Sequence, residues 1–313
     1  MTNNFKYSFD NKRYHTWNYH LQQKFGKKVF KVSLNGGFTC PNIDGTKGVG
    51  GCIYCSSSGS GDFAGNPQKS ILEQFDEVKE KLHKKWPDAK YIPYFQAHTN
   101  TYAPVSELKE KFEPVLELPD VVGLSVATRA DALSDDVVDY LYDISKRTYL
   151  VVELGLQSVF DKTGELINRC HTYEEFLAGY KKLSDKGINT CIHLIMGLPG
   201  EDSKMMLKSV EEVAKLSPHA IKLHLLHVLK GTKLSKMYEN NEFKTLSREE
   251  YVDIIVDALE IIPPEIIIQR LTGDGKKEDL IAPLWSLKKF CVLNEIDKEM
   301  VRRNCVQGCK AKY

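Results

Sequence analysis

Six times along the chain, a short segment rich in Val, Ile, Leu and Tyr is followed by a longer helix-like segment. Short apolar runs bounded by turn residues are typical of strands, and their alternation with helices predicts parallel strands joined by right-handed crossovers. A closed barrel of this kind has eight strand–helix units. Six units therefore predict an α/β fold, a partial (β/α)6 TIM-type barrel with terminal extensions. The predicted strands cover residues 29–33, 91–96, 121–127, 149–156, 189–196 and 220–229, and the predicted helices cover residues 71–85, 105–117, 135–145, 173–186, 204–216 and 248–261.

The remaining segments read as extensions of one domain. The 313 residues, 42% of them hydrophobic, can bury one barrel-sized core, and no linker rich in Gly, Ser or Pro divides the chain. We therefore expect a basic and aromatic N-terminal extension over residues 1–23, a core domain over 24–265, and a C-terminal extension over 266–313 that covers the barrel. A last strand at 266–271 and one or two helices are expected within this C-terminal extension.

Three cysteines stand close together after the first predicted strand. Eleven residues separate Cys40 from Cys52, and two separate Cys52 from Cys55. Three thiolates can hold three irons of a [4Fe–4S] cluster and leave the fourth iron open, whereas clusters held by four cysteines mainly transfer electrons. An open metal position can bind a substrate or cofactor directly, as in catalytic zinc sites. The pattern therefore favours a catalytic [4Fe–4S] cluster with these three cysteines as its ligands.

Two other interpretations of the cysteines stay open. A Cys-x-x-Cys pair is often half of a zinc site or a redox dithiol. Zinc would need a fourth ligand, and no histidine lies between Gly36 and Leu82. A dithiol would not need Cys40. Cys305 and Cys309, near the C-terminus, could hold a second metal with a partner elsewhere, although isolated thiols are favoured there.

The cellular location is inferred from the absence of a signal peptide and of a membrane span in the sequence. The N-terminus is polar, without the apolar core of a signal peptide, and no apolar stretch approaches the length of a membrane span. Eight cysteines in a chain without a secretion signal favour a reducing cytoplasm and free or metal-bound thiols. We therefore expect a cytoplasmic protein that does not enter a membrane.

Polar residues gather where each predicted strand ends. Because the carboxyl ends of parallel strands form one face, these residues predict one shared pocket. Glu153 interrupts an apolar strand, so its burial requires a partner. His224 and His227 are three residues apart, so at most one of them is expected in the pocket. The Gly197–Gly200 segment is first a tight turn, whose amides could also contact a ligand. The other pocket candidates are Gln96, His98, Arg129, Gln157, Cys191 and His193.

Positive charge is concentrated before the cysteines. Residues 11–43 contain no Asp or Glu but six Lys and Arg, interleaved with Tyr14, Trp17, Tyr19 and Phe25. Basic residues mixed with aromatic ones suit a nucleic acid with exposed bases. The alternative is an ordinary basic surface whose aromatic residues belong to the core. Because this segment leads into the cysteine loop, the first interpretation expects it at the pocket mouth, with Lys27, Lys28 and Lys31 on the RNA backbone.

Over about residues 24–270 the chain resembles radical S-adenosylmethionine (SAM) enzymes. The resemblance rests on the three cysteines with Tyr54 before the last one, and on the sequences at 153–158, 168–172 and 197–201. The long gap between the first two cysteines is similar to the branch that contains the catalytic subunit of elongator. These motifs also resemble the oxygen-independent coproporphyrinogen oxidases. Closer still is a small bacterial subfamily linked to modification of the wobble uridine of tRNA.

The resemblance implies roles for individual residues. Cys40, Cys52 and Cys55 would hold the cluster, and Tyr54 would lie against the adenine of SAM. Gln96 begins the segment that stands in place of the family's Gly-Gly-Glu motif, which grips the SAM amino group. The remaining implied cofactor-binding residues are Arg129 and Glu153 at the SAM carboxylate or ribose, Gly197 and Leu198 with backbone near the adenine, and Gln157 and Arg169 within the shared motifs. No catalytic residue is assigned; His98, His193 and Cys191 are the pocket candidates.

The resemblance also implies a reaction and partners. The expected activity is reductive cleavage of SAM and modification of tRNA, converting wobble 5-carboxymethylaminomethyluridine to 5-aminomethyluridine. The expected partners are tRNA and a flavodoxin- or ferredoxin-type electron donor, and no oligomeric state is predicted. Acetyl transfer is not expected, because no second domain follows. Two alternatives stay open: a radical SAM enzyme on a small, porphyrin-like substrate, and a non-catalytic iron–sulfur or zinc protein that senses redox state.

Overall fold

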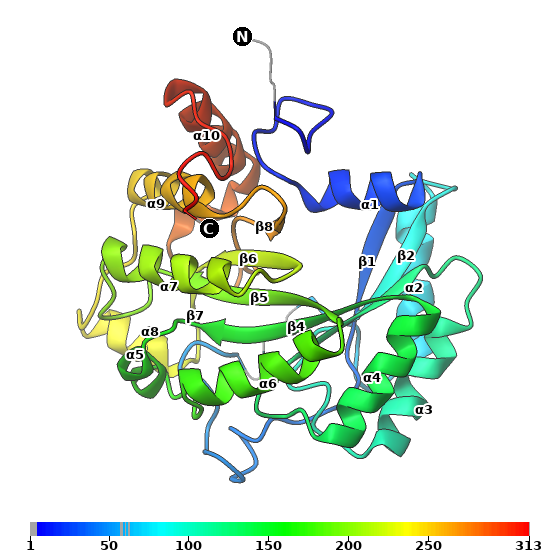
Figure 1. Cartoon of the computed structure of the whole chain (residues 1–313). Helices are drawn as coiled ribbons and strands as arrows, with labels where there is room; N and C mark the ends of the chain where they lie inside the picture. The colour runs from blue at the N-terminus through cyan, green and yellow to red at the C-terminus, as the bar shows by residue number, and fades with distance from the viewer. Residues whose placement is uncertain (1–4, 57–58, 60, 62, 313) are drawn as a thin grey trace.

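Seven parallel strands form one curved sheet with helices on its outer face (Figure 1). The computed structural model describes residues 5–56, 59, 61 and 63–312. The sheet begins with β1 and ends with β8, so the barrel is open, as the sequence predicts. The seventh strand comes from the segment expected to be a covering extension. In sheet order the strands are β1 (Val29–Leu34), β2 (Lys90–Phe95), β3 (Gly123–Thr128), β4 (Tyr149–Gln157), β5 (Asn189–Met196), β6 (Ala220–Leu225) and β8 (Ile267–Arg270).

The six predicted helices are present and pack their apolar faces on the outside of the sheet. Three of them begin with a capping box, in which a Ser or Thr and a Glu three residues later satisfy the first free amides. None of the helices within the described ranges is long and apolar enough to cross a membrane. The predicted helices are α2 (Ile71–His83), α3 (Val105–Leu116), α4 (Asp135–Arg147), α6 (Tyr173–Asp185), α7 (Ser203–Lys215) and α9 (Arg248–Ile261), and the further ones are α1 (Trp17–Phe25), α5 (Asp161–Leu166), α8 (Lys233–Glu239), the 3-10 turn η1 (Leu284–Leu287) and α10 (Lys289–Arg302).

The sixth predicted strand is shorter than expected. β6 ends at Leu225, and the chain turns before it forms β7 (Val228–Leu229). β7 pairs antiparallel with β9 (Leu280–Ala282), outside the main sheet. The segment after β8 therefore folds beside the loop that follows β6.

The interior of the barrel is layered. An apolar layer lies at the amino ends of the strands, and Leu21 from α1 packs into it with inward side chains of the sheet. Inward side chains lie two residues apart along a strand, so the next inward position on each strand forms a second layer. That layer is polar. The apolar layer contains Val29, Ile92, Val151, Cys191 and Ala220, and the residues two positions further along are Lys31, Tyr94, Glu153, His193 and Lys222.

The basic N-terminal segment lies at the wrong end of the barrel for the role expected of it. α1 covers the amino ends of the strands, whereas the cysteine loop lies at the opposite end (Figure 1). The six residues of β1 span about 20 Å between the two. Tyr14 is buried in the core, and the Trp17 ring stacks on Tyr149 at 6.1 Å. Lys31 enters the barrel and pairs with Glu153. The prediction that this segment lies at the pocket mouth is therefore wrong.

Two histidines share one hydroxyl at this closed end. The Tyr149 hydroxyl lies 3.1 Å from His20 Nε2 and 2.6 Å from His219 Nε2. Burial lowers the pKa of His20 to about 4 and that of His219 to about 3. Both imidazoles therefore bind protons more readily in the unfolded chain than in the folded one. Their contribution to stability is complete above the unfolded pKa near 6.5 and is lost as the pH falls toward 4.

We predict that acidification from pH 7.5 to 5 lowers the free energy of unfolding, with His219 alone contributing roughly 1–2 kcal/mol. Urea unfolding at both pH values measures this loss. The His219→Asn variant should lose less stability over the same interval, because its side chain does not titrate. The exposed His83→Asn variant is the control and should behave as the wild type. An equal pH dependence in all three proteins would contradict the assignment.

Candidate functional site

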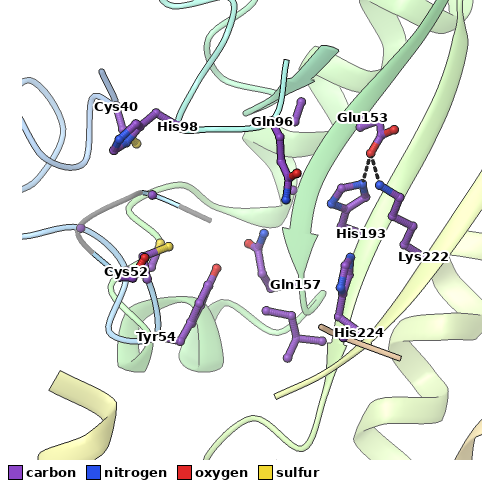
Figure 2. Close-up of a pocket in the computed structure, with 18 of the residues that line it drawn as sticks. Cys40, Cys52, Tyr54, Gln96, His98, Glu153, Gln157, His193, Lys222 and His224 are labelled. Atoms are coloured by element: carbon purple, nitrogen blue, oxygen red, sulfur yellow. Dashed lines mark hydrogen bonds and ion pairs between the residues drawn. The ribbon is translucent and has the colours of Figure 1, made fainter. Parts of the chain in front are cut away.

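A cavity of about 290 Å³ opens at the carboxyl ends of the strands. Figure 2 shows its two walls: Cys40, Cys52 and Tyr54 lie on one side, and Glu153, His193, Lys222 and His224 lie on the other, with Gln96 and Gln157 between them. The structure thus brings together most of the residues that the sequence singles out. The predicted residues that line the cavity are Cys40, Cys52, Tyr54, Cys55, Gln96, His98, Arg129, Glu153, Gln157, Arg169 and His193.

The cysteine loop is held in shape by two asparagines. Gly50 and Gly51 have φ of +77° and +71°, a left-handed conformation that glycine adopts without strain. Asn168 Nδ2 donates to the carbonyl of Gly51 at 2.7 Å, which fixes the turn before Cys52. Asn42 Nδ2 donates to the Asn168 carbonyl and lies 3.5 Å from the Cys52 sulfur. The shared motif at 168–172 therefore anchors the loop, a role that sequence reasoning did not assign to Asn42 or Asn168.

The surroundings favour a thiolate at Cys52. A hydrogen bond with Cys55 lowers the Cys52 pKa to about 6, and contacts with Tyr54 and the positive charge of Arg129 act in the same direction against the effect of burial. Arg129 is held in place by two contacts of 2.9 Å with the Asp131 carboxylate and by a bond of 2.8 Å to the Arg169 carbonyl. Its side chain therefore lies on the cavity wall, but Asp131 already occupies one edge of the guanidinium.

The three thiols suit an iron–sulfur cluster. Thiolates are the usual ligands of such clusters, and all three cysteines line the same cavity. Within the described ranges, the one group whose ligand atoms lie within 4.8 Å of one another consists of Glu153, Cys191 and His193. Thiolates that bind separate irons of a cluster can lie farther apart than the ligands of a single ion. Cys305 and Cys309 belong to no such group in the part of the chain that the structure describes.

Two lysines neutralise Glu153. The carboxylate is fully buried, and it pairs with the ammonium groups of Lys31 and Lys222. Ser125 Oγ donates to it at 2.6 Å and His193 Nε2 at 2.8 Å. Burial alone would raise the Glu153 pKa, but the two lysine charges hold it well below its usual range. The protein itself thus satisfies Glu153, and a contact of this carboxylate with SAM stays a prediction.

The imidazole beside Glu153 is neutral. Burial, with the charge of Lys222, lowers the His193 pKa to about 4, so at neutral pH its Nε2–H donates to the carboxylate. Burial also lowers the Lys222 pKa to about 8. At pH 7 Lys222 is therefore mostly charged, while His193 is not. The polar layer carries two ammonium groups for one carboxylate.

Four predicted residues have structural contacts within the protein. The buried guanidinium of Arg169 donates to the carbonyls of Leu156 and His171, each at 2.9 Å, and so shapes the loop after β4. The Gly197 amide donates to the sulfur of Met206 at 3.0 Å, and Leu198 is buried in an apolar cluster. Neither Gly197 nor Leu198 lines the cavity, and neither does Cys191, which is buried in the apolar layer. Ligand contacts at Gly197, Leu198 and Cys191 therefore stay predictions, and these residues lie behind the cavity wall rather than on it.

Both candidate histidines of the sixth unit line the cavity, although at most one was expected there. The alternation rule applies within a strand, but β6 ends at Leu225. His224 lies on the strand, and His227 lies in the loop beyond it. Sequence reasoning also missed Lys222 and Arg270, which line the same wall. Lys222 could have been found from the pattern that identified Glu153, because both are charged residues within an apolar strand.

Comparison with known proteins adds independent findings. The family model of the Radical SAM superfamily matches residues 45–213, and that of the Radical_SAM C-terminal domain matches residues 218–302. The chain is 55% identical to the YtqA protein of Bacillus subtilis over 98% of its own length and 96% of that protein. It is 30% identical to the tRNA uridine(34) acetyltransferase of Methanocaldococcus jannaschii over 49% of its own length, but it spans only 28% of that protein.

The solved structure of Elp3 from the archaeon Methanocaldococcus infernus has the same fold. It superposes with a TM-score of 0.68 at 20% sequence identity, covering 90% of this chain and 64% of that one. At this identity the superposition supports the fold alone. The similarity includes the curved half-barrel that positions the cavity.

We predict that replacing Cys40, Cys52 or Cys55 with alanine abolishes iron binding after anaerobic reconstitution, because each thiol would hold a different iron. Iron quantification and the visible absorption spectrum measure the loss. The exposed Cys291→Ala variant is the matched control and should keep the iron content of the wild type. Full iron in any of the first three variants would remove that cysteine from the site.

Proposed function

This chain belongs to the radical SAM superfamily, and on that basis we propose that it modifies the wobble uridine of tRNA. It is a radical SAM enzyme and uses a [4Fe–4S] cluster and SAM. The proposed reaction converts 5-carboxymethylaminomethyluridine to 5-aminomethyluridine. The observation that carries the substrate class is the similarity to the tRNA uridine(34) acetyltransferase, whose name places its action at the same nucleotide.

The proposed chemistry balances without an added oxidant. When bound, the cluster and SAM supply a 5′-deoxyadenosyl radical, which removes a hydrogen atom from the substrate. The substrate methylene between amine and carboxylate loses that atom, then an electron and a proton, to form an imine. Water adds to the imine, and the two-carbon unit leaves as glyoxylate. The substrate's electron replaces the one that a flavodoxin- or ferredoxin-type donor supplies for SAM cleavage.

The residues of the cavity divide this work. We infer that Cys40, Cys52 and Cys55 hold the cluster on one wall. Tyr54, Gln96 and Gln157 line the space next to this wall and are placed to contact SAM (Figure 2). The substrate then occupies the space against Lys222 and His224, away from the thiols. The cavity holds the reacting groups close together, and such proximity speeds a reaction between them.

The rim of the cavity offers a surface for RNA. Lys230, Lys233 and Lys277 are exposed on the two segments that flank β7 and β9, next to cavity residues Leu229 and Asp274. Phe63 lines the cavity and is 51% exposed, so a base extruded from the anticodon loop could stack on its ring. Phosphates need charge and bases need stacking surfaces, and this rim has both. It replaces the N-terminal segment as the proposed RNA contact.

We predict that the Lys230→Glu/Lys277→Glu variant binds tRNA about tenfold more weakly and reduces the salt dependence of binding by about one charge per lysine. Filter binding across a salt series measures both quantities. Lys84→Glu/Lys85→Glu reverses two exposed lysines at the opposite end of the barrel and should bind as the wild type. Equal weakening by the two variants would exclude the rim as a specific surface.

We predict that anaerobically reconstituted enzyme, with SAM and a reductant, forms more 5′-deoxyadenosine when tRNA carrying 5-carboxymethylaminomethyluridine is added. Nucleoside mass spectrometry should show 5-aminomethyluridine and matching glyoxylate. The Cys52→Ala enzyme is the control and should form none of these products. An unchanged modified nucleoside, with the same 5′-deoxyadenosine yield in the absence of tRNA, would contradict the proposed substrate.

A further inference from the structure

One row of side chains crosses the cavity wall that faces the cysteines. In the strand register, Gly155 of β4 is paired with His193 of β5, His193 with Lys222 of β6, and Lys222 with Arg270 of β8. An irregularity between β6 and β8 brings Arg270 opposite Lys222, where regular pairing would place Gln269. Bulges next to active sites commonly redirect a side chain in this way. The irregularity gives the wall two adjacent cations.

Two cations on adjacent strands repel each other. Neighbouring strands lie about 4.8 Å apart, and like charges directly opposite destabilise a sheet. Lys222 is almost completely buried, with only 6% of its side chain exposed, so water screens this repulsion poorly. An anion next to both side chains would therefore reduce the repulsion between them.

The chain's own carboxylates compensate this charge incompletely. Glu153 pairs with Lys222, but it also pairs with Lys31. Asp274 lies 3.3 Å from the Arg270 guanidinium, but it also makes contacts of 2.8 and 2.9 Å with the Lys289 ammonium. Among the described residues, each carboxylate is thus shared by two cations, which leaves this wall with excess positive charge.

The neighbouring imidazoles do not contribute to this excess positive charge. Burial lowers the pKa of His193 to about 4 and that of His224 well below its usual value, so both rings are neutral at physiological pH. They can donate or accept hydrogen bonds to a ligand, but the attraction for an anion comes from Lys222 and Arg270. A guanidinium beside an ammonium suits a carboxylate, which can accept from both.

We propose that Lys222 and Arg270 bind a carboxylate group of the substrate at the wall opposite the cysteines. Lys222 lies on the wall opposite Cys40 and Cys52, whereas the amino-acid end of SAM would bind at the open iron beside the thiols (Figure 2). The identification of the ligand rests on the proposed function, because the modified uridine carries a carboxylate bonded directly to the methylene that reacts. Holding the carboxylate on this wall fixes that methylene between the wall and SAM.

The test uses two RNA probes and the complete enzyme. One probe is an anticodon stem-loop with 5-carboxymethylaminomethyluridine at the wobble position, and the other carries the corresponding carboxamide. They differ in charge but hardly in shape. Wild-type holoenzyme with SAM should bind the acid about tenfold or more tightly than the amide, the effect of one charge-assisted contact. In Arg270→Gln the two affinities should lie within about twofold of each other.

The controls separate this contact from general effects. Lys277→Gln removes a rim charge and should weaken both probes equally without changing the acid-to-amide ratio. Arg270→Lys keeps a cation and should retain part of the ratio. A wild-type enzyme that binds acid and amide equally, or an Arg270→Gln enzyme that keeps the full ratio, overturns the proposal. Arg270 is partly exposed, with 34% of its side chain accessible, so its replacement should leave the fold intact.

A wrong substrate assignment can be distinguished from a wrong carboxylate site. N-benzylglycine and N-benzylglycinamide reproduce the acid and amide without RNA. If the tRNA is not a substrate but the acid still binds more tightly than the amide in an Arg270-dependent way, the carboxylate site stands and the proposed function falls. If 5-aminomethyluridine forms with an unchanged KM in Arg270→Gln, the function stands and the carboxylate site falls.

Discussion

A buried carboxylate between two lysines organises this barrel. Glu153 has no exposure to solvent, and Lys31 from β1 and Lys222 from β6 reach it from strands that are not neighbours. Removing one member of a buried ion pair typically costs about 3–5 kcal/mol, because the remaining charge is left without a partner. These three residues, the Lys31–Glu153–Lys222 triad, therefore connect the first strand of the open sheet to the sixth. The triad also forms the floor on which the cavity rests.

The triad separates two kinds of barrel interior. On one side, the apolar layer with Leu21 from α1 closes the amino end. On the other side, the cavity has thiols on one wall and cations on the other. The proposed chemistry uses both walls. The thiols would hold the cluster on one wall, and the cations on the other wall would attract the negatively charged group of the substrate. A substrate held by its anionic group would present its neutral methylene to the centre of the cavity.

Local patterns in the sequence predicted most of the architecture. The alternation of strands and helices and the turn residues around them are encoded within short windows, so six strands and six helices were found with small errors at their ends. The spacing of Cys40, Cys52 and Cys55 is equally local. What the sequence could not reveal depends on contacts between distant segments. The position of α1, the pairing of β8 with β6 and the partners of Glu153 belong to this class, because no local pattern encodes a neighbour across the barrel.

For several predicted site residues the structure shows a partner within the protein, and their contact with a ligand stays a prediction. Arg169 and Glu153 are charged residues, and backbone carbonyls and lysines occupy their polar atoms. The central claim, that the cavity presents the methylene beside a substrate carboxylate to SAM, has one direct test. Anticodon stem-loop RNA is prepared with deuterium on that methylene, and the 5′-deoxyadenosine formed by the reconstituted enzyme is examined by mass spectrometry. We predict that deuterium appears in the 5′-deoxyadenosine; 5′-deoxyadenosine without deuterium, formed while this RNA is converted, would contradict the claim.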